Sequence, residues 1–286
     1  MTVRQSPGVL DIRGFDIVGF VRMTLAEDIG EGGDRTSAAV IPADAMLSAV
    51  MDTRDSVTIA GLPIAAAFFR ALDPDCTIEM LARDGNKAAA GTGLMRISGN
   101  ARALLTAERS ALNTVQHLTG IATLTRAYVN AIAGTGAILL DTRKTLPGLR
   151  LLEKYATRMG GATNHRMRLD DGVMIKDNHI AVAGGVEAAV RAAKAAGLRD
   201  IVVEVDSIDQ IAPALAAGAD RLLLDNMPPS MLRAALAVIG GRVPTEASGG
   251  VNLQTIRAIA ETGVTYISVG RITQSAPAAD IGLDFG

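Results

Sequence analysis

The sequence predicts an α/β protein in which a small N-terminal α+β layer precedes an incomplete parallel α/β barrel of six or seven strands. From residue 137 onwards, strand and helix patterns alternate regularly, which is typical of a parallel sheet covered by helices. Polar residues follow many of these strands, whereas a doubly wound sheet would gather them at one or two positions. The 30 glycines and the 49% apolar residues fit a large core joined by tight turns.

Composition excludes several classes of protein. The net charge of −2 and the 3% of aromatic residues argue against nucleic-acid binding, which needs a basic patch and stacking rings. Cys76 is the single cysteine, so neither an internal disulfide nor a cysteine-based metal cluster can form. No apolar run reaches the ~18 residues of a membrane span, and residues 1–7 lack the apolar core of a signal peptide. We therefore expect a soluble cytoplasmic protein.

The N-terminal part combines helices with strands. Residues 1–13 show no regular pattern, and residues 15–29 form an amphipathic pattern that Gly30 closes. The remaining expectations are turns at 32–37 and 99–100, strands at 45–54, 57–60, 77–81 and 92–98, and a helix at 62–72. A helix over 102–120, resuming to 132, marks the domain boundary without any Pro- or Ser-rich linker.

The C-terminal part repeats one βα unit. Strands are predicted at 137–140, 173–176, 201–205, 221–224, 244–247 and 265–269, with 161–165 as a candidate seventh strand. Helices are predicted at 149–158, 186–196, 208–217, 230–239 and 253–261. This regular spacing is the main evidence for the barrel.

Basic side chains gather around glycine turns in residues 141–180. They are Arg143, Lys144, His165, Arg166, Lys176 and His179. On a nearly neutral chain such a cluster favours a local anion pocket over a basic surface. A solvated charged face is the alternative, but the cations alternate with apolar strand-like pieces instead of repeating at helical spacing.

Two further patterns follow predicted strands. Residues 248–250 and Gly270 resemble the phosphate site made by the last loops of many barrels, although plain βα turns explain them equally well. Glu204 and Asp225 end neighbouring strands and suit Mg²⁺ or ribose hydroxyls, with ion pairing to nearby cations as the alternative. His117 lies midway along a helix and is expected to be structural. No serine nucleophile elbow is present.

Five motifs together resemble the quinolinate phosphoribosyltransferase family (nicotinate-nucleotide pyrophosphorylase, carboxylating). They are ERSALN at 108–113, DTRKTLPGLR at 141–150, NHR at 164–166, IKDNHI at 175–180 and EASGG at 246–250. The resemblance runs from residue 15 to 285. It implies an N-terminal α/β sandwich domain over 1–112, rejoined by 272–286, and an incomplete α/β barrel over 113–271. It also implies a homodimer or higher assembly whose sites are shared between subunits.

The resemblance implies that phosphoribosyl pyrophosphate and quinolinate form nicotinate mononucleotide, pyrophosphate and CO2, a step of de novo NAD biosynthesis. Arginines suit the two carboxylates of quinolinate because guanidinium groups bind carboxylates through two hydrogen bonds. By resemblance, the carboxylates are bound by Arg109, Arg143 and Arg166, with His165 and Lys176 beside them. Catalysis is assigned to Lys144, which could meet the pyrophosphate, and to Glu204 and Asp225, which would hold ribose hydroxyls and the cofactor Mg²⁺, directly or through other ligands. The remaining substrate-binding residues are Thr142, Ser248, Gly249, Gly250 and Gly270.

The chain departs from the family pattern in two places. Residues 270–275 read GRITQS where the family usually carries GALTHS, and Arg168 stands where a glycine is usual. The alternatives are a pyrophosphorylase-like homologue of molybdenum transport loci acting on another base, a catalytically silent assembly module, and a phosphate-binding barrel such as a sugar-phosphate lyase. The motif IKDNH and the full set of candidate cations and carboxylates favour the quinolinate enzyme.

Overall fold

The structure, a computed structural model, describes residue 12 and residues 14–285 and divides into two compact units. The first unit comprises the described residues up to Leu124, together with Leu151–Gly161 and residues 276–285. The second unit comprises Thr125–Arg150 and Ala162–Ser275. Apart from Ile12, the expectations for residues 1–13 lie outside the described residues.

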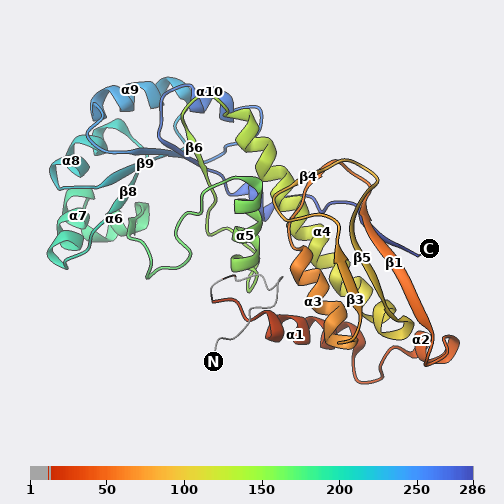
Figure 1. Ribbon diagram of the computed structural model, residues 1–286. Helices are drawn as coiled ribbons and strands as arrows, with labels where there is room; N and C mark the ends of the chain where they lie inside the picture. Colours follow the sequence, from red (N-terminus) through yellow and green to blue (C-terminus); the bar gives the residue numbers. More distant parts are fainter. Residues whose placement is uncertain (1–11, 13, 286) are drawn as a thin grey trace, which may run out of the picture. The chain divides into compact units, whose positions relative to one another are not determined.

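The first unit contains an antiparallel sheet in the order β12-β1-β5-β3 (Figure 1). Its strands are β1 (Met46–Thr53), β3 (Thr77–Met80), β5 (Thr92–Asn100) and β12 (Ile281–Phe285), and a separate pair joins β2 (Val57–Thr58) to β4 (Lys87–Ala88). In β1 the side chains of Ala49, Met51 and Thr53 alternate into the core, as expected for a sheet with one buried face. The C-terminal strand β12 pairs with β1, so the end of the chain returns to this unit.

Helices α1 (Ile17–Ile29), α2 (Arg35–Val40) and α3 (Leu62–Leu72) also belong to the first unit. Helix α3 carries much of the core, since Phe68 and Phe69 are fully buried. The predicted turn at 32–37 is wrong in its second half, where α2 begins. Asp34 caps this helix by accepting a hydrogen bond from the Ser37 backbone nitrogen at 3.0 Å.

The long helix α4 (Ala101–Ala131) follows β5 directly, so the turn predicted at 99–100 is wrong. The units divide at Leu124/Thr125, whereas the sequence placed the boundary at 112/113. Contacts explain the difference, because Thr119 Oγ1 and Thr123 Oγ1 accept hydrogen bonds from the backbone nitrogens of residues 60 and 58. The helix therefore continues to pack on the first unit beyond residue 112.

Helix α5 (Arg150–Gly160) follows the first barrel strand in the sequence, but most of it groups with the first unit. The Tyr155 hydroxyl donates a 2.7 Å hydrogen bond to Asp84 Oδ2. The fully buried Glu153 carboxylate lies 2.9 Å from His117 Nε2, which agrees with a structural role for His117. The sequence pattern assigned the helix at 149–158 to the barrel, because a local pattern does not indicate side-chain contacts with distant residues.

The second unit is built on six parallel strands in the order β6-β11-β10-β9-β8-β7. They are β6 (Ile138–Leu140), β7 (Met174–Ile175), β8 (Val202–Val205), β9 (Arg221–Asp225), β10 (Thr245–Ser248) and β11 (Tyr266–Ser268). The predicted fold class, with its incomplete six-strand parallel barrel, is confirmed. The candidate seventh strand at 161–165 is reduced to one parallel bridge between Thr163 and Leu140.

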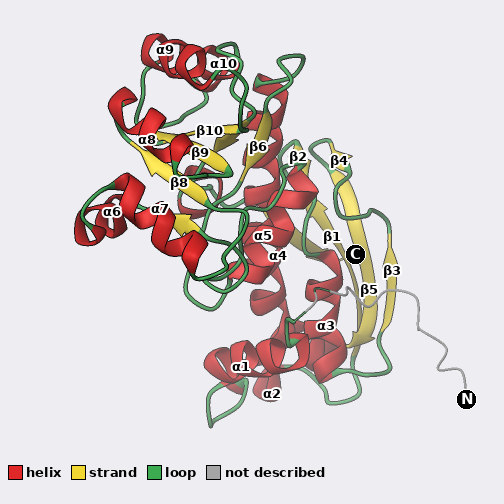
Figure 2. Cartoon of the chain, turned by 90° about the vertical axis from the view of Figure 1, so that its left-hand side faces the viewer, coloured by secondary structure: helices red, strands yellow, loops and turns green. Residues whose placement is uncertain are grey.

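Helices surround these strands (Figure 2). They are α6 (Asp177–Ala183), α7 (Val186–Ala195), the 3₁₀ turn η1 (Ile208–Gln210), α8 (Ile211–Ala216), α9 (Pro229–Ile239), α10 (Ile256–Ala260) and α11 (Arg271–Gln274). The sequence did not predict α6, a short helix without a buried side chain that gives no amphipathic signal. The strand residues Val203, Leu222 and Ile267 are fully buried. Within the described residues, no helix is both long and apolar enough to cross a membrane.

Candidate active site

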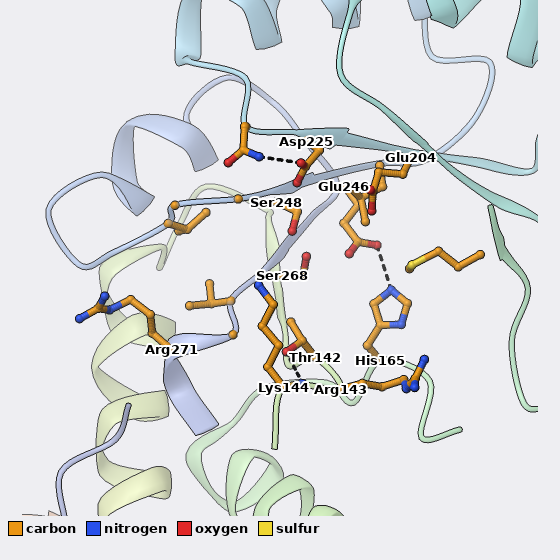
Figure 3. Close-up of a pocket in the computed structure, with 18 of the residues that line it drawn as sticks. Thr142, Arg143, Lys144, His165, Glu204, Asp225, Glu246, Ser248, Ser268 and Arg271 are labelled. Carbon is orange, nitrogen blue, oxygen red and sulfur yellow. Dashed lines mark hydrogen bonds and ion pairs between the residues drawn. The ribbon is translucent and has the colours of Figure 1, made fainter. Parts of the chain in front are cut away.

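A cavity of about 510 Å³ opens where the six parallel strands of the second unit end (Figure 3). Parallel strands point the same way, so the residues at their carboxyl ends converge. The cavity is lined by every predicted substrate-binding residue except Arg109: Thr142, Arg143, Lys144, His165, Arg166, Lys176, Glu204, Asp225, Ser248, Gly249, Gly250 and Gly270. Residues from seven places in the chain thus share one pocket, whose volume suits a small organic substrate.

Two cationic side chains, those of Arg143 and Arg166, line this cavity. Burial and the nearby charge of Arg143 lower the pKa of Arg166, against the opposing effect of the Asp171 charge. The Nε atom of Arg143 is buried and has no hydrogen-bond partner among the residues that the structure describes. A buried donor without a partner is unfavourable until an acceptor pairs with it. Arg143 therefore favours an anionic ligand, such as a carboxylate.

Lys144 is held at the mouth of the cavity through its backbone. Its nitrogen donates to Thr142 Oγ1 at 3.0 Å, and its carbonyl oxygen accepts from the buried Thr273 hydroxyl at 2.6 Å. Gly270 lies against its side chain, and a Cβ there would come within 2.8 Å of Lys144 Cδ. The ammonium group of this exposed side chain can therefore reach an anion beside the glycine loops.

The two candidate carboxylates have different partners. The Lys176 ammonium forms an ion pair with Glu204 Oε2, so the ion-pairing alternative from the sequence holds for Glu204. Asn226 Nδ2 donates a 2.6 Å hydrogen bond to Asp225 Oδ2, and no cation pairs with Asp225 in the described part of the chain. Asp225 is also the direct neighbour of Ser248 across β9 and β10. Its carboxylate therefore stands next to the candidate phosphate loop.

The glycine loop after β10 requires glycine at one position for a specific reason. Gly249 has a φ of +89°, and an added Cβ would lie 2.1 Å from Asn226 Oδ1. Gly250 has a φ of +61°, but open space surrounds the corresponding position. The loop thus brings its backbone against Asn226, which itself adopts a positive φ of 54° and donates its nitrogen to Ser248 O at 2.8 Å.

We expect Gly249→Ala to destabilise the second unit more than Gly250→Ala. The control carries only the left-handed backbone cost of about 1–2 kcal/mol, whereas Gly249→Ala adds steric overlap, for a total of about 3 kcal/mol or more. Chemical denaturation of both variants measures the difference. Equal losses would show that Asn226 moves away without cost.

Sequence reasoning missed several residues that line the cavity. They are Met174, Leu223, Asn226, Glu246, Val251, Ser268, Val269, Arg271 and Gln274. Of these, Glu246 could have been found, because residues 246 and 248 lie two apart on one strand and therefore point to the same face. Arg271 and Gln274 are two of the positions where the chain departs from the family pattern, and both line the cavity.

Two predicted cations lie elsewhere. Arg109 is an exposed residue of α4 in the first unit and does not line the cavity. His179, part of the predicted cluster, accepts a 2.9 Å hydrogen bond from the Lys176 nitrogen through Nδ1 and caps α6. Its ring therefore supports the loop that carries Lys176.

Comparison with known families decides the family of the chain. Residues 34–119 match the family model "Quinolinate phosphoribosyl transferase, N-terminal domain", and residues 121–284 match the corresponding C-terminal domain. Together these matches cover most of the chain. The chain belongs to the quinolinate phosphoribosyltransferase family. The family expected from the five motifs is confirmed.

Several members of the quinolinate phosphoribosyltransferase family are close relatives. The carboxylating nicotinate-nucleotide pyrophosphorylase of Mycobacterium leprae is 43% identical, and the match covers 92% of this chain and 95% of that protein. The chloroplastic protein of the same name from Arabidopsis thaliana is 40% identical over 94% of this chain and 82% of that protein. The solved structure of the Francisella tularensis nicotinate-nucleotide pyrophosphorylase is 39% identical, with a TM-score of 0.90 over 97% of this chain and all of that one.

Proposed function

We propose that this chain transfers the phosphoribosyl group of phosphoribosyl pyrophosphate to quinolinate with loss of CO2, giving nicotinate mononucleotide and pyrophosphate. The observation that carries the proposal is the Arg143–Arg166 pair, set at the strand ends opposite two carboxylates and a glycine loop. A dicarboxylate satisfies neighbouring guanidinium groups, and the loop and Lys144 supply what a phosphate needs. The names of the relatives support the same reaction.

Quinolinate carries two adjacent carboxylates on a pyridine ring. Arg143 has a buried Nε donor to offer, and Arg166 is oriented by a 2.9 Å hydrogen bond from Nη1 to Gly172 O. Each guanidinium can donate to one carboxylate, which relieves the repulsion between the two cations. The Lys176 ammonium group, which is ion-paired with Glu204, lines the same cavity.

Phosphoribosyl pyrophosphate fits the opposite side of the cavity. The backbone of residues 248–250 and Gly270 lines this part of the cavity, where its N–H groups donate to a phosphate group in this proposal, and Lys144 adds a positive charge beside it. Asp225, next to Ser248, is placed to accept hydrogen bonds from ribose hydroxyls. In this proposal, the C1 atom of the ribose faces the pyridine nitrogen.

The reaction then needs charge stabilisation more than a nucleophile. Pyrophosphate leaves with the electron pair of its bond to C1, and Glu204 and Asp225 offset the positive charge that develops there. The pyridine nitrogen forms the new bond and becomes positively charged. The neighbouring carboxylate departs as CO2, its electron pair stays on the ring carbon, and water supplies the proton that replaces it.

Mg²⁺ is the expected cofactor, and its fit depends on the carboxylates that line the cavity. The described residues hold no group of three or more His, Cys, Asp or Glu side chains that could bind a metal ion. Mg²⁺ often binds through one or two carboxylates plus substrate phosphates and water, so Asp225, and Glu204 if Lys176 moves, would fit it. When bound, the ion would neutralise charge on the departing pyrophosphate.

The decisive assay mixes the purified full chain with quinolinate, phosphoribosyl pyrophosphate and Mg²⁺ and measures nicotinate mononucleotide. Product should appear only when all components are present, and CO2 and pyrophosphate should form in equal amounts. Absence of product with an active control enzyme in the same buffer would overturn the proposal.

The cytoplasmic location stays a prediction.

Glu204→Ala and Asp225→Ala are expected to leave quinolinate binding nearly intact but to reduce turnover about 100-fold or more, the scale typical of losing a group that stabilises transition-state charge. Both carboxylates act on the ribose and the metal in this proposal. Calorimetry with quinolinate and steady-state kinetics separate the two effects. If a variant mainly lost quinolinate affinity, the role proposed for that carboxylate would be wrong. Glu204→Ala is the stricter test, because it also removes the ion-pair partner of Lys176.

A further inference from the structure

Glu246 is a fully buried carboxylate on β10 that lines the cavity and points toward the ring of His165 (Figure 3). Its Oε2 atom lies 3.3 Å from His165 Nε2 and 3.5 Å from Arg221 Nη1. Burial alone would raise the pKa of Glu246, but hydrogen bonds with His165 and Ser268 and the charge of Arg221 outweigh this effect and lower the pKa below its ordinary value. Glu246 is therefore ionised at neutral pH.

The hydrogen bonds of the His165 ring indicate which of its two nitrogens carries a proton. The backbone nitrogen of Arg166 donates to His165 Nδ1 at 2.8 Å, so Nδ1 carries no proton. The ring proton then lies on Nε2, where it points to Glu246 Oε2. Glu246 thus selects both the tautomer and the orientation of the ring.

A second buried carboxylate holds the backbone of His165. Asp141, also fully buried, accepts a 2.8 Å hydrogen bond from the His165 nitrogen through Oδ1. The ring and the backbone of His165 are therefore each attached to a buried carboxylate. Arg166 follows directly, so its position depends on both attachments.

Arg221 completes the support on the far side of Glu246. Its guanidinium stacks over the Tyr266 ring, 4.3 Å from the ring centroid, and Tyr266 is the direct neighbour of Glu246 across β10 and β11. Stacking on an aromatic face fixes a guanidinium plane. The order Tyr266, Arg221, Glu246, His165, Arg166 links three strands of the barrel to the candidate carboxylate site.

Building on the proposed function, we propose that Glu246 is a positioning residue, which sets His165 and through it Arg166 in the geometry that binds the quinolinate carboxylates. Its own negative charge opposes an anionic ligand, so charge and geometry predict opposite effects of removing it. If geometry dominates, loss of the acceptor weakens quinolinate binding. If charge dominates, the same loss tightens it.

The test compares Glu246→Met, which removes acceptor and charge, with Glu246→Gln, which keeps an acceptor oxygen. We expect quinolinate affinity, measured by calorimetry, to fall about tenfold or more in Glu246→Met, the scale on which partners that orient a histidine act. Glu246→Gln should stay within about threefold of wild type, and the KM for phosphoribosyl pyrophosphate within about twofold in both variants. Unchanged or tighter quinolinate binding in Glu246→Met would overturn the proposal, as would equal losses in the two variants.

Glu153→Met is the matched control, because Glu153 is also fully buried beside a histidine but does not line the cavity. It should change stability without a selective loss of quinolinate affinity. If the wild-type chain itself does not bind quinolinate, the proposed function fails, and this outcome differs from equal binding by wild type and Glu246→Met.

A spectroscopic readout does not depend on whether Glu246→Met folds. The chain has three histidines, so ¹⁵N-histidine NMR gives few signals, and those of His165 are assigned by their loss in His165→Gln. The wild-type chain should show a proton on Nε2 of His165. A ring with its proton on Nδ1 and none on Nε2 would overturn the proposed arrangement.

Discussion

Arg143→Ala and Arg166→Ala are each expected to weaken quinolinate binding by about 2–5 kcal/mol, the cost of removing one partner of a desolvated charge pair. This corresponds to a loss of about 30-fold to several thousand-fold in affinity. The remaining carboxylate would be left without its guanidinium partner inside the cavity. Phosphoribosyl pyrophosphate binding should change far less, because its candidate contacts lie at Lys144 and the glycine loops.

Calorimetry with quinolinate measures the effect, and Arg168→Ala provides the control. Arg168 lies two residues beyond Arg166, carries the same charge and is exposed in an ion pair with Asp170. It does not line the cavity, so its loss should leave the affinity unchanged. Wild-type affinity in both Arg143→Ala and Arg166→Ala would remove these residues from the quinolinate site.

A mixture of two inactive variants, Arg109→Ala and Lys144→Ala, is expected to regain about a quarter of wild-type activity after subunit exchange, from random pairing in a two-fold dimer. Arg109 is the one predicted substrate-binding residue that lies in the first unit and does not line the cavity. We propose that it completes the site of a second copy in a homodimer. A mixed dimer then has one site with both changes and one site with neither.

The experiment requires that each variant be inactive alone and that exchange be shown, for example with two affinity tags. Under these conditions, no recovery would mean that Arg109 serves its own subunit or none. If Arg109 were only an exposed helix residue, its substitution would change stability by about half a kcal/mol at most and leave activity intact. An active Arg109→Ala variant would therefore already contradict the shared site.

From the amino-acid sequence alone, the parallel strands and the polar residues at their ends could be predicted. Apolar runs such as 201–205 and 221–224 form buried strands, because burial in the sheet removes their apolar side chains from water. Since parallel strands end at one edge, Glu204, Asp225 and Ser248 had to converge, and they line one cavity. Short elements such as α6 gave no signal, because they bury no side chain.

Which distant side chains contact one another is visible only in the folded chain. His165 and Glu246 are 81 positions apart, and nothing in the local pattern of either indicates that one orients the other. Likewise α5 packs with the first unit through Tyr155 and Asp84, although it lies between barrel segments in the sequence. Local patterns report how a segment buries its own apolar face, whereas a buried hydrogen bond depends on two side chains brought together by the whole fold.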